Sequence, residues 1–220
     1  MVFFLLSFPF LGEKLEYVVK YGPFTAGRAW MWVEKDTLQG MEVYRIISEE
    51  RTEGFFNLFF KVEDRYDSWV RVDSFCSCRF RKKIQEGRYK NTVEIEFGEE
   101  KVRYSDGREY PGRECMVDLL SSIYYVRLLP LEVGKTFYIP VHADEITGDL
   151  KIEVVEKERV RVPWGEFEAF RVKPVLPETK AFGRKGGLEM WYSDTPEHIP
   201  VKIKMRTFFG SLVFLLERRN

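Results

Sequence analysis

Residues 199–206 read Ile-Pro-Val-Lys-Ile-Lys-Met-Arg. Apolar side chains stand at every second position from Ile199 to Met205, and basic side chains alternate with them from Lys202 to Arg206. Because successive side chains of a β-strand point to opposite faces, this alternation predicts a strand with one buried and one solvated face. Strands of this kind are typical of antiparallel sheets.

The same alternation recurs along the chain. Residues 15–21 and 56–62 place apolar side chains at every second position, and residues 89–97 do so at Tyr89, Val93, Ile95 and Phe97. Turn-forming clusters such as Tyr21-Gly22-Pro23 and Thr147-Gly148-Asp149 separate these segments. With roughly a dozen candidate strands, the sequence predicts a mainly β protein, built as a curved antiparallel sheet that forms a partly open barrel or a sandwich.

One segment departs from this pattern and predicts a single short helix at about 117–128. Leu119, Ile123 and Arg127 recur there at helical spacing. Asp118 is the expected N-cap, because its carboxylate can accept hydrogen bonds from the first amides of a helix. Pro130 limits continuation of the helix.

Composition and charge exclude several classes of protein. The chain has 220 residues, 45% of them hydrophobic, with 35 basic and 35 acidic side chains. It is too apolar for a disordered chain, and its zero net charge argues against nucleic acid as a partner. Mixed charges at 32% of residues are common in proteins from hot environments. No run reaches the roughly 18 apolar residues that span a bilayer.

The N-terminal segment, residues 1–10, is apolar and uncharged. It has the apolar part of a secretory signal but lacks the basic start and the small-residue cleavage site. Two interpretations stay open: a remnant of a signal peptide, or an apolar arm that packs on the protein. We expect residues 11–220 to form one β-rich domain, because we find no linker or internal repeat.

The three cysteines do not fix the compartment. Cys76 and Cys78 share one face of the predicted strand. We expect all three to be buried thiols that pack as small apolar side chains. A disulfide from Cys115 to Cys76 or Cys78 is the alternative, and it would leave one thiol over.

The sequence contains no recognisable catalytic or metal-binding motif. There is no phosphate-binding glycine loop and no Gly-x-Ser-x-Gly elbow. A metal site assembled from His142, Asp144, Glu145 and distant His198 is conceivable, but that spacing is not specific. We therefore predict no catalytic residue, no metal ligand and no cofactor.

Aromatic side chains are the one hint of a ligand. Residues 28–33 read Arg-Ala-Trp-Met-Trp-Val and are apolar on both faces, as expected of a strand that is covered by a helix or lines a cavity. Tyr124 and Arg127 would then point from the helix into the concavity of the sheet and hold a polar head group. The candidate ligand-binding residues are Trp30, Trp32, Phe56, Phe60, Trp69, Tyr124, Arg127 and Trp191. Aromatic residues also fill ordinary cores, so a core role is the alternative.

The order of several segments carries a resemblance to a known family. These segments are residues 8–17, 21–29, 62–69, 118–127, 130–135, 162–170 and 190–201, with Gly210-Ser211 at the end. No single piece is specific, but the ordered set resembles the bacterial family known as domain of unknown function 3108, from about Phe8 to Leu216. The resemblance implies an exported protein with a curved antiparallel sheet or partly open barrel and a helical segment, broadly similar to envelope lipoprotein carriers. It implies no catalytic residues.

Two functions follow as expectations. The first is a non-enzymatic protein of the periplasm or cell envelope whose curved sheet binds a lipid, a lipidated chain or another apolar ligand. The second is a structural or protein-interaction module that presents edge strands to an envelope partner. A hydrolase with an unrecognised site is a third, weaker hypothesis.

Overall fold

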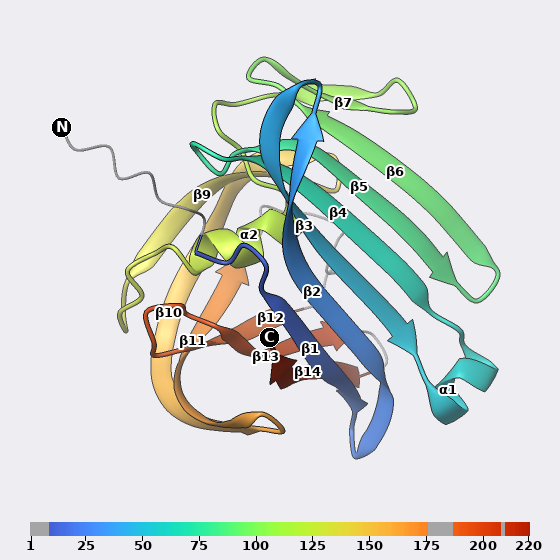
Figure 1. The fold of residues 1–220 in the computed structure, drawn as a ribbon, viewed down its shortest axis with the longest axis vertical. Coiled ribbons are helices and arrows are strands. Elements are labelled where there is room, and N and C mark those ends of the chain that lie inside the picture. The colour runs from blue at the N-terminus through green and yellow to red at the C-terminus, as the bar shows by residue number, and fades with distance from the viewer. Residues whose placement is uncertain (1–8, 176–186, 208–209) are drawn as a thin grey trace.

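A computed structural model describes residues 9–175, 187–207 and 210–220 of the chain. In these residues fourteen strands form one antiparallel sheet in the order β8-β7-β6-β5-β4-β3-β2-β1-β14-β13-β12-β11-β10-β9 (Figure 1). The strands are β1 (Lys14–Tyr21), β2 (Phe24–Leu38), β3 (Met41–Thr52), β4 (Glu63–Arg71), β5 (Ser77–Glu86), β6 (Tyr89–Phe97), β7 (Lys101–Tyr104), β8 (Glu109–Pro111), β9 (Thr136–Ala143), β10 (Ile146–Val162), β11 (Gly165–Val175), β12 (Gly187–Ser193), β13 (Pro200–Thr207) and β14 (Gly210–Arg219). The helices are α1 (Gly54–Phe59) and α2 (Leu119–Val126). The prediction of a curved antiparallel sheet is confirmed.

The sheet is a succession of neighbouring strands with one long-range pairing. Strands β1 to β8 follow one another on one side, and β9 to β14 on the other. The first and last strands meet in the middle, where Val18 pairs with Leu215 and Tyr21 with Leu212. This pairing joins the two halves into one continuous sheet, because it supplies ladder hydrogen bonds to both strands.

The sheet curves so that β9 and β8, its two edges, approach each other. Val117 forms a parallel bridge with Val141 of β9, and the Thr147 hydroxyl donates to the carbonyl of Pro111 at 2.6 Å. Curvature of this kind turns a twisted sheet into an open barrel and covers part of its edges. We call this line of contact the seam.

Helix α2 lies inside the curve of the sheet (Figure 1). It begins as predicted: the Asp118 carboxylate accepts from the backbone N–H groups of Leu120 and Ser121, each at 2.9 Å. Two clusters of buried apolar side chains pack in the interior, and residues of α2 contact both. The predicted helix at 117–128 is therefore confirmed, with slightly tighter bounds.

The close approach of the β2 and β3 backbones explains why residue 27 is a glycine. A side chain at Gly27 would collide with the carbonyl oxygen of Arg51 on β3, and a bulge between Val19 and Lys20 interrupts the neighbouring ladder. Glycine is the residue that tolerates such an approach.

The alternation at 56–62 does not form the predicted strand. Residues Gly54–Phe59 form α1, and β4 begins only at Glu63. The ladder between β2 and β3 ends at the pair Gly27–Thr52, and the Glu53 N–H still donates to the Ala26 carbonyl of β2 before the helix begins. The backbone hydrogen bonds of residues 54–60 close locally instead, as from the Phe60 N–H to the Phe56 carbonyl at 2.9 Å.

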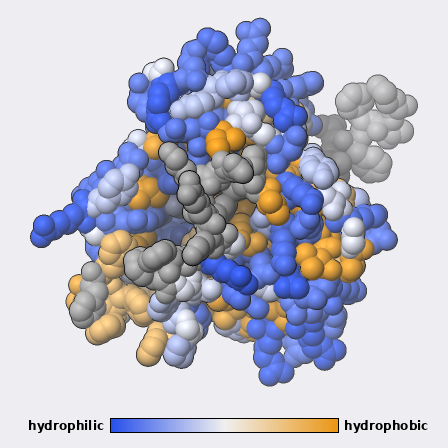
Figure 2. Space-filling view, turned by 180° about the vertical axis from the view of Figure 1, so that it is seen from behind, coloured by the Kyte–Doolittle hydropathy of each residue, from blue (hydrophilic) through white to orange (hydrophobic). Residues whose placement is uncertain are grey.

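Hydrophilic residues cover most of the face shown in Figure 2, and separate apolar patches interrupt them. Among the described residues, neither helix has the length and apolar character needed to cross a bilayer. The apolar residues 1–8, on which the two interpretations of the N-terminus depend, lie outside the described residues.

Candidate functional site

The concave face of the sheet borders a cavity of about 730 Å³. Its wall comes from strands on both sides of the β1–β14 pair and is largely apolar. The apolar lining includes Ala29, Met31, Phe80, Ile84, Val93, Ile95, Leu150, Ile152, Val172, Leu188, Met190, Ile203, Met205 and Phe214. This volume lies within the range of roughly 300–1,000 Å³ that is typical of small-molecule sites.

Period-two alternation sets which side chains reach the cavity. On β13, Ile203 and Met205 line it, while the intervening residues Lys202 and Lys204 must point to the other face of the sheet. The ammonium of Lys202 lies 4.0 Å from the ring centre of Trp191. The predicted division of this strand into an apolar face and a basic face is therefore confirmed.

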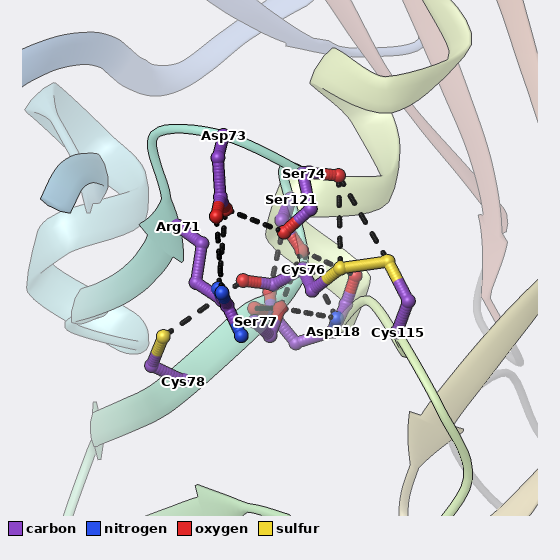
Figure 3. Close-up of a disulfide and its surroundings, with 9 residues drawn as sticks. All are labelled: Arg71, Asp73, Ser74, Cys76, Ser77, Cys78, Cys115, Asp118 and Ser121. Atoms are coloured by element: carbon purple, nitrogen blue, oxygen red, sulfur yellow. Dashed lines mark hydrogen bonds and ion pairs between the residues drawn. A yellow bond between two sulfur atoms is a disulfide. The ribbon is translucent and has the colours of Figure 1, made fainter. Parts of the chain in front are cut away.

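Helix α2 closes one end of the cavity. Leu119, Leu120, Ile123 and Val126 line the cavity from this helix. Asp118 at its start is buried and also accepts hydrogen bonds from Ser68 at 2.5 Å and from Ser77 at 2.6 Å (Figure 3). Burial raises the pKa of Asp118, although these hydrogen bonds oppose the shift.

Three carboxyl groups gather toward the opposite end. Glu50 on β3 pairs in register with Asp64 on β4, and Glu86 ends β5. Burial raises the pKa of Glu50 to about 7, and the nearby charges of Asp64 and Glu86 add to the shift. Burial also raises the pKa of Asp64, while the hydrogen bond from the Gln85 backbone N–H and the charge of Lys82 oppose the shift. Near neutral pH the Glu50 carboxyl therefore exchanges its proton, and it can act either as a hydrogen-bond donor or as an acceptor.

His142 on β9 belongs to the seam. Its Nε2 lies 2.9 Å from the Tyr104 hydroxyl and its Nδ1 lies 2.8 Å from the Thr147 hydroxyl. Since the Thr147 proton goes to the Pro111 carbonyl, Nδ1 must donate and Nε2 must accept. Burial lowers the pKa of His142 to about 4, so the neutral ring links β9 across the seam to Tyr104 of β7. Among the described residues, no group of three or more His, Cys, Asp or Glu side chains converges as a metal site.

Trp30 and Trp32 lie on β2 with cations stacked on them. The guanidinium of Arg51 is 4.5 Å from the ring centre of Trp30. Lys14 and Arg65 approach the ring of Trp32 at 6.0 and 5.7 Å. Their neighbours in β2, at positions 29 and 31, line the cavity, so both tryptophans occupy the outer face.

Trp69 and Trp191 have the same kind of environment. The Trp69 indole donates to the Asp36 carboxylate at 2.8 Å, and the Arg45 guanidinium lies 5.0 Å from its ring centre. The Trp191 indole donates to Glu158. These polar partners place both rings on the outer face, where they shield the sheet and hold charged side chains.

The other four predicted residues lie in two places. Phe56 and Phe60 belong to α1 and the turn after it, and Phe60 is exposed. Tyr124 is buried against Phe10, with ring centres 5.8 Å apart. The buried Arg127 guanidinium donates to both carboxylate oxygens of Glu13 at 2.5 and 3.0 Å.

Among the described residues, the cavity lining includes none of the eight predicted ligand-binding residues. The four predicted tryptophans therefore do not line this cavity, and their role in binding a ligand stays a prediction. The sequence does contain the correcting signal: Arg28 and Glu34 share the parity of Trp30 and Trp32 and mark that face as solvated. Sequence reasoning also missed Glu50, whose partners come from other strands.

The structure corrects the expectation of three buried thiols. Cys76 and Cys115 form a disulfide across 39 residues, and Cys78 is a half-buried thiol (Figure 3). Burial raises the pKa of the Cys78 thiol, which makes it a weak nucleophile at neutral pH. A second cavity of about 650 Å³ lies beside the disulfide and is lined partly by Arg71 and Arg79.

A family model described as protein of unknown function (DUF3108) matches residues 16–217, and the chain belongs to this family. No curated protein sequence matches the chain significantly. Among solved structures, a β-barrel-like protein of domain of unknown function DUF1849 from Brucella abortus is similar in fold, with 9% identity, a TM-score of 0.65 and coverage of 94% of this chain and 96% of that chain. A DUF1089 family protein from Pseudomonas aeruginosa (11% identity, TM-score 0.40, 79% and 87% covered) and the hypothetical protein CT021 from Chlamydia trachomatis (7%, 0.43, 94% and 86%) are more distant.

Proposed function

We propose that this member of the DUF3108 family is a non-enzymatic binding protein of the bacterial cell envelope. It holds an apolar or amphipathic ligand, such as a lipid or a lipidated chain, in the concavity of its sheet. The observation that carries the proposal is the cavity of about 730 Å³ with a largely apolar wall. Most protein interiors are filled at close to crystal density, so a space of this size and character is suited to a ligand.

The chemistry of the wall favours an extended apolar ligand over a sugar or a nucleotide. Side chains such as Met31, Ile152, Ile203 and Met205 offer no hydrogen-bond donor, and only the thioethers are weak acceptors. Each methylene group that leaves water for such a surface contributes about 0.8 kcal/mol. The polar residues near Glu50 would then meet the head group, while α2 receives the end of the chain.

The disulfide supports a location in the cell envelope. Structural disulfides persist in oxidising compartments such as the periplasm and are rare in the cytosol of mesophiles. Cys76–Cys115 ties the β4–β5 turn to the segment before α2, so it stabilises the end of the molecule that the helix closes. Intracellular proteins of hyperthermophiles are an exception to this rule, because they too contain disulfides. Fractionation of cells of the source organism measures the location of the protein directly.

A pair of neighbouring substitutions tests the cavity directly. Met205→Trp fills the cavity from β13, while Lys204→Trp adds the same ring on the opposite face of the same strand. With the neutral apolar probe N-phenylnaphthylamine, we expect wild type and Lys204→Trp to enhance the fluorescence of the probe equally. Met205→Trp should weaken probe binding roughly tenfold. Equal binding by both variants would show that the probe lies elsewhere.

A protein-interaction module is the second candidate, and one observation favours it. Strand β9 is an edge of the sheet. The backbone of Val117 bonds to Pro140 and His142 along the outer side of this strand. Tyr138, nearer the start of the same edge, is 66% exposed. Residues 136–138 would accept an added strand. This stretch of edge is short, which is the reason that we rank it below the cavity.

A further inference from the structure

Large apolar side chains are exposed at the end of the molecule that carries α1. Leu58 is 81% exposed and Phe55 is 69% exposed, both on α1. Phe24, Phe60 and Tyr89 are more than half exposed as well. We call these five residues the apolar tip. Single exposed apolar residues are ordinary, but a cluster of this kind marks an interaction surface.

Contacts with the sheet hold the tip in place. The Glu53 N–H donates to the Ala26 carbonyl at 3.0 Å, which fixes the start of α1 against β2. The ring of Phe56 packs edge-on against Tyr21, with centres 6.2 Å apart. The Gly87 N–H donates to the Lys61 carbonyl at 2.7 Å and ties the β5–β6 turn to the chain after α1. Three turns of the sheet thus present one apolar surface.

Basic side chains surround the tip. Arg88 and Lys90 flank Tyr89, are exposed, and have no ion pair among the described residues. Arg51 and Lys61 also lie near α1, where they pair with Glu53 and Glu63. The tip therefore combines protruding aromatic and leucine side chains with two exposed cations, Arg88 and Lys90.

The cavity reaches the same end. Glu50 and Glu86 line it at the ends of β3 and β5, next to the chain segments that carry α1 and the β5–β6 turn. Tyr89 belongs both to the cavity lining and to the apolar tip. A molecule that entered between these residues would pass from the tip into the apolar interior.

We propose that the apolar tip docks on a lipid bilayer that contains anionic lipids. The apolar side chains enter the boundary between head groups and acyl chains, and Arg88 and Lys90 bind the lipid head groups. This surface deepens the proposed function, since it places the cavity beside the source of a lipid ligand. Docking itself does not require that the cavity be filled.

Shape and charge favour a bilayer over a protein partner. The apolar side chains of the tip protrude from turns and a six-residue helix. Aromatic and leucine side chains beside Lys and Arg are the composition of segments that lie in the membrane interface. Anionic lipids attract each nearby Lys or Arg, which matches the positive charges at the tip.

Vesicle flotation tests the proposal with the full chain. Vesicles of phosphatidylcholine with three-tenths phosphatidylglycerol should carry the wild-type protein, and vesicles of phosphatidylcholine alone should carry much less. We expect the double variant Phe55→Ser with Leu58→Ser to bind roughly tenfold more weakly. Arg88→Glu with Lys90→Glu should remove most of the preference for phosphatidylglycerol.

Matched controls separate docking by the tip from nonspecific adsorption to vesicles. Tyr138→Ser removes an equally exposed aromatic side chain from β9 and should leave vesicle binding unchanged. Met205→Trp, which fills the cavity, should also leave it unchanged, so docking and ligand binding can fail separately. Because Phe55 and Leu58 are exposed, the variant Phe55→Ser with Leu58→Ser should have the circular dichroism spectrum of the wild type.

Three results would overturn the docking proposal. The first is that wild type does not float with anionic vesicles. The second is equal flotation of wild type and the Phe55→Ser, Leu58→Ser variant. The third is that Tyr138→Ser weakens flotation as much as the tip variant, because exposed aromatic side chains in general would then account for binding. Protection of the tip by a protein partner without vesicle binding would assign the surface to that partner.

Discussion

The two ends of the barrel differ in how their buried polar groups are satisfied. At the end closed by α2, Asp118 accepts several hydrogen bonds, and Arg127 is paired with Glu13. At the end that carries α1, Glu50 lies beside Asp64 and Glu86, and burial raises its pKa to about 7. The comparison teaches that stabilising contacts concentrate at one end, while unfavourable charge contacts and exposed apolar side chains concentrate at the other. Such local costs are common where a protein binds something.

Removing Glu13 should cause the largest loss of stability. Its carboxylate accepts from Arg127 and also from Arg219 at 2.9 Å. We expect Glu13→Gln to lower the free energy of unfolding by about 3–5 kcal/mol, because it leaves a buried guanidinium without its counter-charge. Urea unfolding measures the change. The half-exposed Glu217 pairs with Arg28, and Glu217→Gln should cost under about 1 kcal/mol. Similar losses in the two variants would contradict the special role of the α2 end.

Opening the disulfide should have the next largest effect. Cys115→Ser releases a loop that spans 39 residues and should lower the free energy of unfolding by about 3 kcal/mol. Cys78, which is a free thiol, supplies the control. Cys78→Ser should lower the free energy of unfolding by under about 1 kcal/mol. Thermal unfolding with and without reductant measures both. A reductant effect that persists in Cys115→Ser would place the sensitive bond elsewhere.

Replacing Glu50 should stabilise the protein at neutral and alkaline pH. A carboxyl whose pKa is raised on folding binds its proton more tightly in the folded state, so its contribution to stability falls as pH rises from about 4.5 to about 7. Glu50→Gln should therefore match wild type near pH 4 and exceed it by about 2 kcal/mol at pH 8.

The contribution of His142 to stability changes with pH in the opposite direction, over nearly the same pH range. Its pKa is lowered to about 4 by burial, so its contribution to stability is lost as pH falls from about 6.5 to about 4. The difference between the unfolding curves of Glu50→Gln and wild type isolates the carboxyl from the imidazole. A difference that does not change with pH would show that Glu50 has an ordinary pKa.

Substitutions on the outer face should have the smallest effect. Trp30→Ala removes a ring that stacks with Arg51 and should cost about 1 kcal/mol in stability, with no change in probe binding. Ala29→Ser, one position away on the cavity side, should instead weaken probe binding measurably. If Trp30→Ala weakened probe binding more than Ala29→Ser, the two faces of β2 would have to exchange roles.

Local patterns predicted most of the scaffold but few of the residues that line the cavity. The alternation from Ile199 to Met205 and the cap at Asp118 depend on neighbours in sequence, and both are confirmed. The helix α1 was missed because alternation alone cannot show where a sheet ends. The bond between Cys76 and Cys115 and the raised pKa of Glu50 depend on strands that only the fold brings together.

Native mass spectrometry of the full chain, purified from its own source under gentle conditions, tests the central claim most directly. The account predicts a bound lipid or lipid-like molecule at about one per chain, which Met205→Trp loses and Lys204→Trp retains. A clean mass without ligand in all three proteins, with the fold intact by circular dichroism, would contradict the claim that this cavity is a binding site.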